Sequence, residues 1–323
     1  MSAAQGIGVG EQQQTEDRQH DEGSGRRGSG GDDGSAAPSQ PGRWRGTPYL
    51  LLLPGMLWLT IFFIVPLVTL LSTSTQTRPS GAEIGVYRQT FRFANYPDSI
   101  HEYLAVFGRS FLYALIATVV ALAISYPLAY AIAFKAGRWK NLLLVLVVAP
   151  FFVSFLLRTI AWKQILADEG WVADILRALH VLGPQSHIIN SAPAVVIGIT
   201  YNFLPFMILP IYASLERVDP RMMEAAGDLY AGALTTLRKV TLPLSLPGVV
   251  AGTLLTFIPA AGDYVNAALL GNRNTTMIGN VIDSRFLKIV DYPTAAVLSV
   301  SLMVAILVLV GFYIKRAGTE ELV

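Results

Sequence analysis

Residues 110–134 read SFLYALIATVVALAISYPLAYAIAF, a stretch of 25 positions without a charged side chain. A helix needs roughly 20 predominantly apolar residues to cross the hydrocarbon core of a bilayer. Residues 191–215 form a second uncharged run of 25 positions, and residues 293–314 form a third of 22. These runs predict helices that span a membrane rather than buried helices of a water-soluble domain.

The composition supports a membrane protein and excludes several other classes. Charged residues make up 14% of the chain, whereas a soluble domain usually carries about 25%. The net charge of +2 is too small to indicate a nucleic-acid partner. Without cysteine, the chain has no disulfide, thiolate metal site or cysteine nucleophile, and its four histidines lack the HExxH spacing. We therefore expect no catalytic residue, no metal site and no cofactor in this chain.

Six membrane-spanning helices are expected, which makes the fold an all-α integral membrane domain. Backbone groups in lipid must pair within the protein, so helices are the economical form for segments of this length. The spans are placed at about residues 49–71, 111–134, 142–165, 193–212, 247–269 and 294–314. The membrane domain then covers residues 46–316, and residues 317–323 form a short tail.

The first 45 residues differ from the rest of the chain. Residues 1–43 contain ten glycines and no aromatic side chain. Such a segment buries too little apolar surface to offset its ordering entropy, so we expect a disordered tail over residues 1–45.

Basic residues predict how the spans are oriented, because loops rich in Lys and Arg stay in the cytoplasm. With six spans, the basic flanks fall on one side: Arg43, Arg45, Lys135, Arg138, Lys140, Arg217, Arg221, Arg238, Lys239, Lys315 and Arg316. Both termini are therefore expected in the cytoplasm. The opposite side would hold residues 72–109, 166–191 and 270–292, and residues 171–179 have the apolar spacing of a helix lying along the membrane surface.

The longest cytoplasmic loop carries a helix signal of its own. Asp219 suits an N-cap and Pro220 the first helical position, and Gly232 can end the helix. A second short helix is expected over residues 233–240. One apolar stripe follows the i, i+3, i+4, i+7 spacing: Met222, Ala225, Ala226 and Leu229. The stripe either packs against the protein's own helices or docks into the groove of a cytoplasmic partner.

The same loop resembles the EAA loop of the permeases of ABC importers. That pattern reads E-A-A, three residues, G, nine residues, I, any residue, L-P. Glu224-Ala225-Ala226 supplies its first part, and Val240-Thr241-Leu242-Pro243 supplies its last part at the expected distance. Val240 replaces isoleucine, and Tyr230 stands where the glycine is expected, so the turn is predicted to shift toward Gly227 or Gly232.

The resemblance covers residues 45–316 and is greatest to the B-type permeases of spermidine/putrescine importers. The matching stretches are FLLRTIAW at 155–162, NFLPFMILP at 202–210 and MIGNVI at 277–282. The resemblance implies a type I importer permease in a bacterial inner membrane, with residues 216–246 as its cytoplasmic coupling loop. It also implies a second permease subunit, two cytoplasmic ATPase subunits and an extracytoplasmic solute-binding protein. Amino acids, sulfate or iron are alternative solutes, and a secondary transporter acting alone is a further alternative.

Two groups of candidate site residues follow, the first in the loop that resembles the EAA loop and the second from polar and ionisable residues on or beside the spans. The coupling contacts to the ATPase are Met222, Glu224, Ala225, Ala226, Asp228, Leu229, Gly232, Leu242 and Pro243. The translocation path would be lined by Asp263, Tyr264, Trp162, Tyr201 and Asn202.

Asp263 is the candidate on which the path prediction depends, because ionisable residues within spans are costly and usually face the protein interior. With Tyr264 beside it, Asp263 suits a polycation through charge and cation–π attraction. The alternatives are that Asp263 caps a helix end and that Trp162, Tyr201 and Asn202 anchor or pack. Pro259 and Gly262 are expected to interrupt the helix before Asp263. Arg158 and Lys163 are expected to reach the membrane interface without a role in transport.

Overall fold

The structure is a computed structural model that describes residues 47–178, 183 and 187–317. The predicted tail over residues 1–45 and nearly all of the C-terminal tail lie outside the described residues. Contacts within the chain divide it into two units, Met1–Pro54 and Gly55–Val323. All packing given below lies within the second unit.

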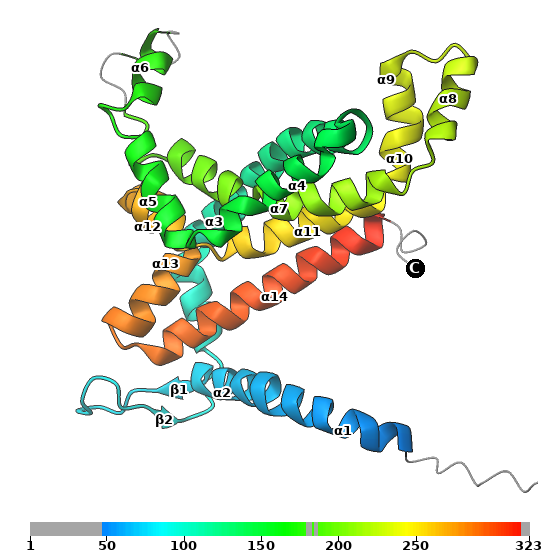
Figure 1. The fold of residues 1–323 in the computed structure, drawn as a ribbon. Coiled ribbons are helices and arrows are strands. Elements are labelled where there is room, and N and C mark those ends of the chain that lie inside the picture. The colour runs from blue at the N-terminus through cyan, green and yellow to red at the C-terminus, as the bar shows by residue number, and fades with distance from the viewer. Residues whose placement is uncertain (1–46, 179–182, 184–186, 318–323) are drawn as a thin grey trace, which may run out of the picture. The chain divides into compact units, whose positions relative to one another are not determined.

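Four helices of the described chain are long and apolar enough to cross a membrane (Figure 1). They cover Leu52–Ser74, Asn95–Lys135, Ala192–Glu216 and Tyr292–Arg316. The first combines α1 (Thr47–Leu59), a π-helical turn (Thr60–Ile64) and α2 (Val65–Ser74), and the second combines α3 (Asn95–Tyr130) with the π-helical turn Ala131–Lys135. The others are α7 (Ala192–Glu216) and α14 (Tyr292–Ala317). The count rises to six if each of two bent helix pairs is one span.

The third predicted span is not continuous. A short 3₁₀ turn (Gly137–Trp139) leads into α4 (Lys140–Val148), a second 3₁₀ turn (Ala149–Phe152) and then α5 (Phe155–Ile165). The two halves are bent by 97°. Pro150 has no N–H for the helical ladder, and Val153, the residue that follows the second 3₁₀ turn, adopts an extended backbone. The span expected over residues 142–165 is therefore present only as a bent pair of helices, and hydropathy gave no sign of the bend.

The fifth predicted span is interrupted as well, at the place that the sequence indicates. α11 (Leu246–Ala261) ends at Gly262, and the chain resumes a helix at α12 (Val265–Leu270). Sixteen residues of α-helix are about 24 Å long, which is shorter than the hydrocarbon core of about 30 Å. The residues between the two helices are Gly262, Asp263 and Tyr264, so two of the five candidate path residues lie in this break.

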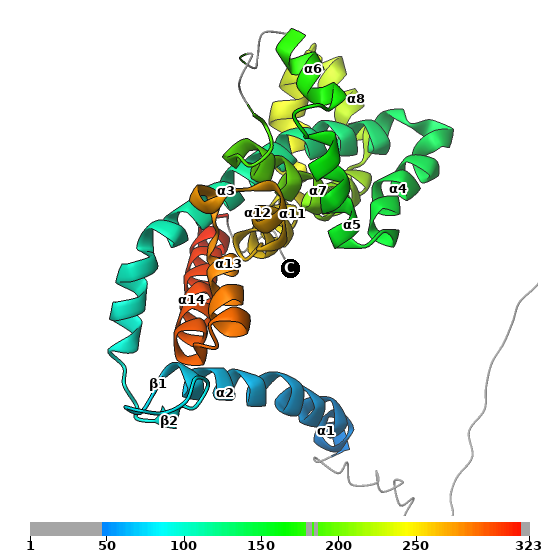
Figure 2. The same cartoon turned by 90° about the vertical axis from the view of Figure 1, so that its left-hand side faces the viewer.

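The core of the membrane domain is formed by α3, α7 and α11, which pack against one another along their lengths. Gly248 and Gly252 allow α11 to approach α7 closely, in the small-xxx-small spacing of membrane helix contacts. A Cβ on Gly248 would lie 2.5 Å from the backbone oxygen of Pro210, and one on Gly252 would lie 3.0 Å from that of Met207. α14 packs on α2 and α3 (Figure 2).

The second helix begins at Asn95, 16 residues before the predicted start at residue 111. Hydropathy missed this extension because it carries charged side chains that bond to the segment before α14. The Arg109 guanidinium donates to the backbone oxygens of Thr276 (2.8 Å) and Asn274 (2.6 Å). Asp98 and Glu102 pair with Arg92 and Arg285.

The remaining elements are short. An antiparallel hairpin joins β1 (Gln76–Thr77) to β2 (Arg88–Gln89), with Gln76 opposite Gln89. α6 (Trp171–Ala178) confirms the helix expected near residues 171–179, although residue 179 lies outside the described part. A 3₁₀ turn (Arg273–Thr275), α13 (Ile278–Asp283) and a π-helical turn (Ser284–Lys288) lead to α14.

Candidate functional site

The coupling loop folds into the predicted pair of short helices. α8 (Pro220–Asp228) is capped by Asp219, whose carboxylate accepts a hydrogen bond from the backbone N–H of Arg221 at 2.9 Å. α9 (Ala233–Thr236), a π-helical turn (Leu237–Thr241) and α10 (Leu242–Leu244) return the chain toward α11. Figure 1 shows α8 beside α9 and α10. The cap at Asp219 and both helices confirm the local prediction.

The apolar stripe of α8 is not covered by other described parts of the chain. No residue of α8 is buried, and Met222 and Leu229 are 50% and 82% exposed. Of the four stripe residues, Ala226 is half-buried and Ala225 is exposed. The alternative in which the stripe packs against the protein's own helices therefore finds no support among the described residues.

The turn after α8 lies at Tyr230, not at a neighbouring glycine. Tyr230 has a φ of +57°, its N–H donates to Gly227 O at 2.9 Å, and the N–H of Ala231 donates to Ala226 O at 3.0 Å. These are the bonds of a helix end closed by a left-handed residue. Gly232 has an extended backbone and precedes α9, so its prediction as the helix end was wrong. The turn keeps the position expected for the glycine of the EAA pattern.

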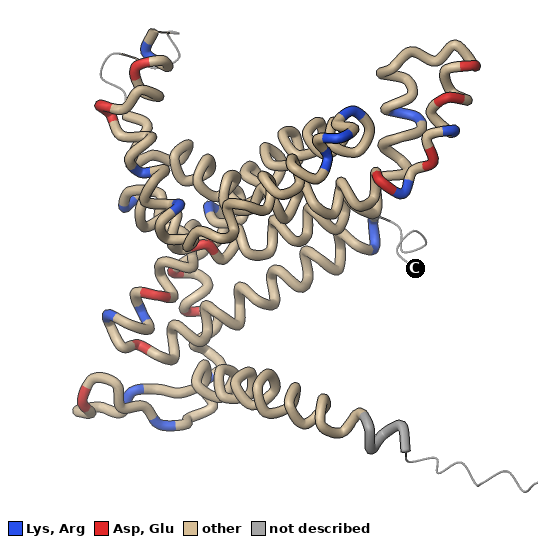
Figure 3. Tube along the Cα trace, in the orientation of Figure 1, with Lys and Arg blue, Asp and Glu red and all other residues tan. Residues whose placement is uncertain are grey.

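The basic loops meet at one end of the membrane domain. Lys140, at the start of α4, pairs with Glu216, at the end of α7, with 2.6 Å between Nζ and Oε1. Glu216 leads directly into the coupling loop, and Figure 3 shows further Lys and Arg residues along that loop and at the end of α14. The loop between the second and third spans and the coupling loop therefore lie on the same side.

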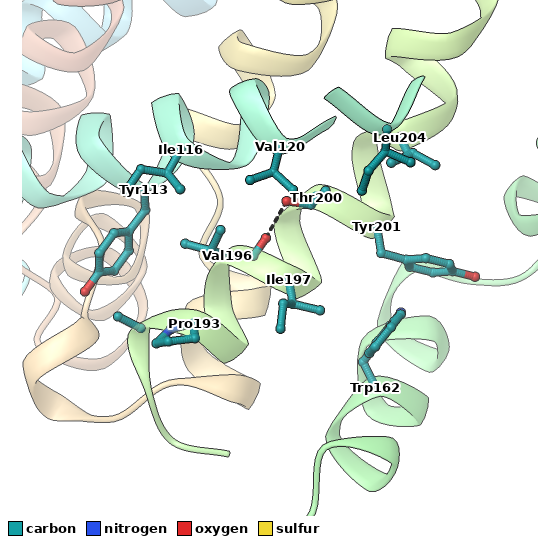
Figure 4. A pocket seen from close by; sticks show the side chains of 12 residues that line it. Tyr113, Ile116, Val120, Trp162, Pro193, Val196, Ile197, Thr200, Tyr201 and Leu204 are labelled. Atoms are coloured by element: carbon teal, nitrogen blue, oxygen red, sulfur yellow. Dashed lines mark hydrogen bonds between the residues drawn. The ribbon is translucent and has the colours of Figure 1, made fainter. Parts of the chain in front are cut away.

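Two of the predicted path residues, Trp162 and Tyr201, line one cavity. Their rings meet edge to face, with 5.2 Å between centroids. The cavity has a volume of about 570 Å³ and is bounded by α3, α5 and α7 (Figure 4). Its other lining is mainly aliphatic, and the Thr200 hydroxyl donates back to Val196 O at 2.7 Å. The cavity wall thus offers aromatic faces and no charged group.

Asn202 and Asp263 belong to a second, polar cluster. Asp263 is only 6% exposed, and its two carboxylate oxygens accept from the backbone N–H and the side-chain Nδ2 of Asn266, each at 2.8 Å. The Oδ1 of Asn266 accepts from Asn202 Nδ2 at 3.1 Å, and Asn202 Nδ2 also lies 3.1 Å from Thr159 Oγ1. This chain of bonds, the polar bridge, ties α5 and α12, the helices that follow the two breaks, to α7.

Within the polar bridge, Asp263 has the geometry of a helix cap. Its carboxylate accepts a hydrogen bond from the backbone N–H of Asn266, in the first turn of α12. Tyr264 lies apart from the bridge: it is half exposed, and its backbone oxygen accepts from Asn280 Nδ2. The five predicted path residues are therefore divided between the aromatic cavity, the polar bridge and the exposed Tyr264.

Arg158 corrects a prediction. It is 8% exposed rather than reaching the interface, and its guanidinium carbon lies 5.6 Å from the ring centroids of Phe151 and Phe155. Its Nε and Nη1 have no hydrogen-bond partner among the described residues. Phe155 precedes Arg158 by three residues on the same helix, whereas Phe151 lies in the 3₁₀ turn before the break, so the bend between the two halves brings Phe151 to the guanidinium. Lys163 is exposed, as expected.

Comparison with known proteins defines the class. Residues 125–317 match the family of the binding-protein-dependent transport system inner membrane component. This match covers more than half of the chain, and it includes the coupling loop and the polar bridge. The chain belongs to this family of multi-pass inner-membrane transport subunits.

The relatives and the solved structures agree with this membership. The chain is 35% identical to the spermidine/putrescine transport system permease protein PotB of Escherichia coli, over 76% of this chain and 89% of the relative. It is also 35% identical to PotB of Haemophilus influenzae, over 80% of this chain and 90% of the relative. A bacterial alginate ABC transporter in complex with a pentasaccharide-bound periplasmic protein has the same fold, with a TM-score of 0.65, 16% identity and coverage of 85% and 94%.

Proposed function

We propose that the chain is the permease subunit of an ATP-driven importer and forms part of the translocation path for a polyamine such as spermidine or putrescine. The observation that carries this proposal is the 35% identity to spermidine/putrescine permeases over nearly their whole length. If the solute were instead an amino acid, sulfate or iron, the same fold would bind a solute of different chemistry. The sequence contains no phosphate-binding loop, so ATP hydrolysis belongs to separate subunits.

The importer would contain a second permease subunit, two ATPase subunits and a solute-binding protein outside the membrane. The family description and the periplasmic protein bound to the alginate transporter support a binding-protein partner. Both termini would lie in the cytoplasm, because the basic loops gather at the end that bears the coupling loop.

The ATPase would dock on residues 219–243. The exposed stripe of α8 supports this assignment, since an amphipathic helix that exposes anchors at i, i+3, i+4 and i+7 fits a groove on a partner. The contacts would be made by the nine residues assigned above, from Met222 to Pro243. Small alanine side chains allow close approach, and flexible methionines fill an irregular groove.

Along the path, the polyamine would pass the aromatic pair Trp162 and Tyr201 and the break that holds Asp263 and Tyr264. The aromatic faces suit an alkyl chain that carries ammonium groups. Asn202 would act with Asp263 through the polar bridge. Because Asp263 is buried beneath its own hydrogen bonds, its access to the solute would require the break between α11 and α12 to open.

The test is uptake of labelled spermidine by cells that lack their own polyamine import and express the complete importer. Uptake should be competed by unlabelled putrescine and not by sulfate, iron or amino acids. Ala226→Arg should abolish uptake, leave the permease in the membrane and release the ATPase subunits during purification.

Two variants complete this experiment. Ala225→Arg, at an exposed position of the same helix, should release the ATPase as well, which excludes a folding defect specific to the half-buried Ala226. Ala94→Arg, at an exposed position before α3, should change neither uptake nor assembly. Competition by sulfate, iron or an amino acid would contradict the polyamine assignment, and an intact Ala226→Arg complex with normal ATP hydrolysis would contradict the docking assignment.

A further inference from the structure

Tyr230 combines full exposure with an unfavourable backbone conformation. Its side chain is 98% exposed at the tip of the turn between α8 and α9, and its φ is +57°. L-residues, with asparagine and aspartate as partial exceptions, are strained in this left-handed conformation because Cβ approaches the following carbonyl oxygen. Glycine would adopt it without that strain.

Nothing in the turn requires an aromatic side chain. The two bonds that close the helix are formed by backbone atoms, from the N–H groups of Tyr230 and Ala231 to the oxygens of Gly227 and Ala226. The exposure of Tyr230 leaves its ring almost without packing against the described residues. The backbone strain is therefore not offset by contacts of the side chain within the described chain.

We propose that the Tyr230 ring is an anchor that inserts into a pocket of the ATPase subunit and determines which ATPase this permease accepts. The inference rests on the docking of the ATPase on residues 219–243 proposed above. Tyr230 is continuous with that surface, since Leu229 and Leu234, also strongly exposed, flank it on the two helices. Tyrosine is one of the residues that dominate the affinity of protein interfaces, because it buries a large rigid ring and keeps a polar tip.

The charges around Tyr230 favour a protein pocket over the membrane surface. Glu224 and Asp228 are exposed on the same short helix, and Asp228, two residues before Tyr230, is the charged residue nearest to it in the chain. The exposed basic residues of the loop lie eight or nine residues from Tyr230 in the chain: Arg221, Arg238 and Lys239. Carboxylates at these positions would be repelled by anionic lipid headgroups. They would instead match basic side chains at the rim of a pocket, which gives register and selectivity to the contact. The recognised feature on the ATPase is thus an apolar, ring-sized pocket with a basic rim.

The test exploits the fact that a structural role and a contact role predict opposite results. In a structural role, Tyr230→Gly relieves strain and leaves ATPase binding equal or tighter. In a contact role, it weakens binding although the turn is relaxed. Tyr230→Asn separates the loss of the ring from the added flexibility of glycine, because asparagine tolerates the left-handed conformation. Tyr230→Phe retains the ring.

The measurement is the dissociation constant of the importer's own ATPase subunit for the purified permease complex in detergent. We expect Tyr230→Gly and Tyr230→Asn to weaken binding by about tenfold or more, and Tyr230→Phe to restore most of the affinity. Phe91→Gly is the matched control: Phe91 is also an exposed aromatic residue at positive φ (+50°), but it lies between the hairpin and α3. It should leave the dissociation constant unchanged.

The outcomes separate this inference from the docking proposal on which it rests. If Ala226→Arg and Ala225→Arg release the ATPase while Tyr230→Gly and Tyr230→Asn bind normally, docking stands and the role of Tyr230 is wrong. If Ala226→Arg and Ala225→Arg also bind normally, the docking proposal itself fails. A loss seen only in nanodiscs of anionic lipid, and not in detergent, would show that Tyr230 contacts lipid and would overturn the inference.

Discussion

Asp263 has both carboxylate oxygens engaged by a single residue, Asn266. An ionised carboxylate only accepts hydrogen bonds, so it fixes the Asn266 amide with its Nδ2 toward Asp263 and its Oδ1 toward Asn202. Asn202 must then donate, which leaves its own Oδ1 buried without a partner among the described residues. One acid thus sets the direction of every bond in the polar bridge.

Asp263→Asn tests whether this acid acts on the solute or only caps α12. Asn266 and Asn202 can both turn their amides over, and the amide oxygen of the substituted side chain can still accept from the N–H of Asn266, because asparagine caps helices about as well as aspartate. If Asp263 meets the polyamine, the lost charge should reduce spermidine uptake by about tenfold or more, since a carboxylate is worth far more in a low-dielectric path than in water. ATPase docking should persist.

The melting temperature of the purified complex is the control for Asp263→Asn. It should change little if the amides turn over as described. Normal uptake would show that Asp263 caps α12 and has no role in the translocation path. A large fall in melting temperature would indicate that damaged packing, and not the lost charge, causes any loss of uptake.

Residue-level predictions succeeded where the signal was local. Asp219 was placed correctly because its cap spans two residues. Asp263 stood out as an acid at the edge of an uncharged run, and its role in the path stays a prediction. Thr159 and Asn266 were missed because they meet Asn202 across 43 and 64 residues of sequence, and no local pattern encodes that meeting. The sequence offered one signal for Asn266. It lies three residues after Asp263, which is the spacing of a helix cap, and Gly262 marks the preceding helix end.

At the scale of the elements, the third and fifth expected spans are broken, and the other four expected spans are continuous helices. Hydropathy locates long apolar runs but is insensitive to where a helix bends, so residues 142–165 were predicted as one span despite Pro150. It also missed residues 95–110, whose charged side chains find partners in a distant segment. The close contact of α7 with α11 likewise depends on which face Gly248 and Gly252 present, and that emerges only from the packing.

Gly248→Ala should separate α7 from α11. The new methyl group would lie 2.5 Å from both Pro210 O and Ser214 Cβ, and the Pro210 oxygen belongs to backbone that cannot rotate away. Overpacking of this kind typically costs about 1–3 kcal/mol, so the purified complex should melt at a lower temperature.

Gly311→Ala is the matched control for this contact. Gly311 also lies within a helix, α14, but a Cβ there meets nothing within 4 Å. Alanine should leave the melting temperature equal or slightly higher, because it favours a helix by up to about 1 kcal/mol over glycine. Equal melting temperatures for Gly248→Ala and Gly311→Ala would contradict the close packing of α7 and α11.

At the scale of the whole molecule, orientation in the membrane decides what each end does. The coupling loop shares its end with the basic loop of Lys135, Arg138 and Lys140, and the Lys140–Glu216 pair links the two. The sequence predicted this grouping from the positions of Lys and Arg alone, since it needs only the order of the spans. The side of the membrane on which that end lies stays a prediction.

The absence of cysteine makes the orientation directly testable. Arg138→Cys, in the exposed loop between the second and third spans, should react with a membrane-impermeant maleimide only in inverted vesicles. Ala94→Cys, before α3, should react only in cells with an intact inner membrane. The reverse pattern would place the coupling loop outside and contradict ATPase docking on it.

The central claim, an ATP-driven polyamine permease, is tested most directly by the initial rate of labelled spermidine entry into proteoliposomes. These would hold the complete importer, with ATP on the side of the coupling loop and the solute-binding protein on the other. We expect entry that requires this chain, ATP and the binding protein together. Spermidine entry at the same rate without ATP, driven by an ion gradient alone, would contradict the claim and indicate a secondary transporter.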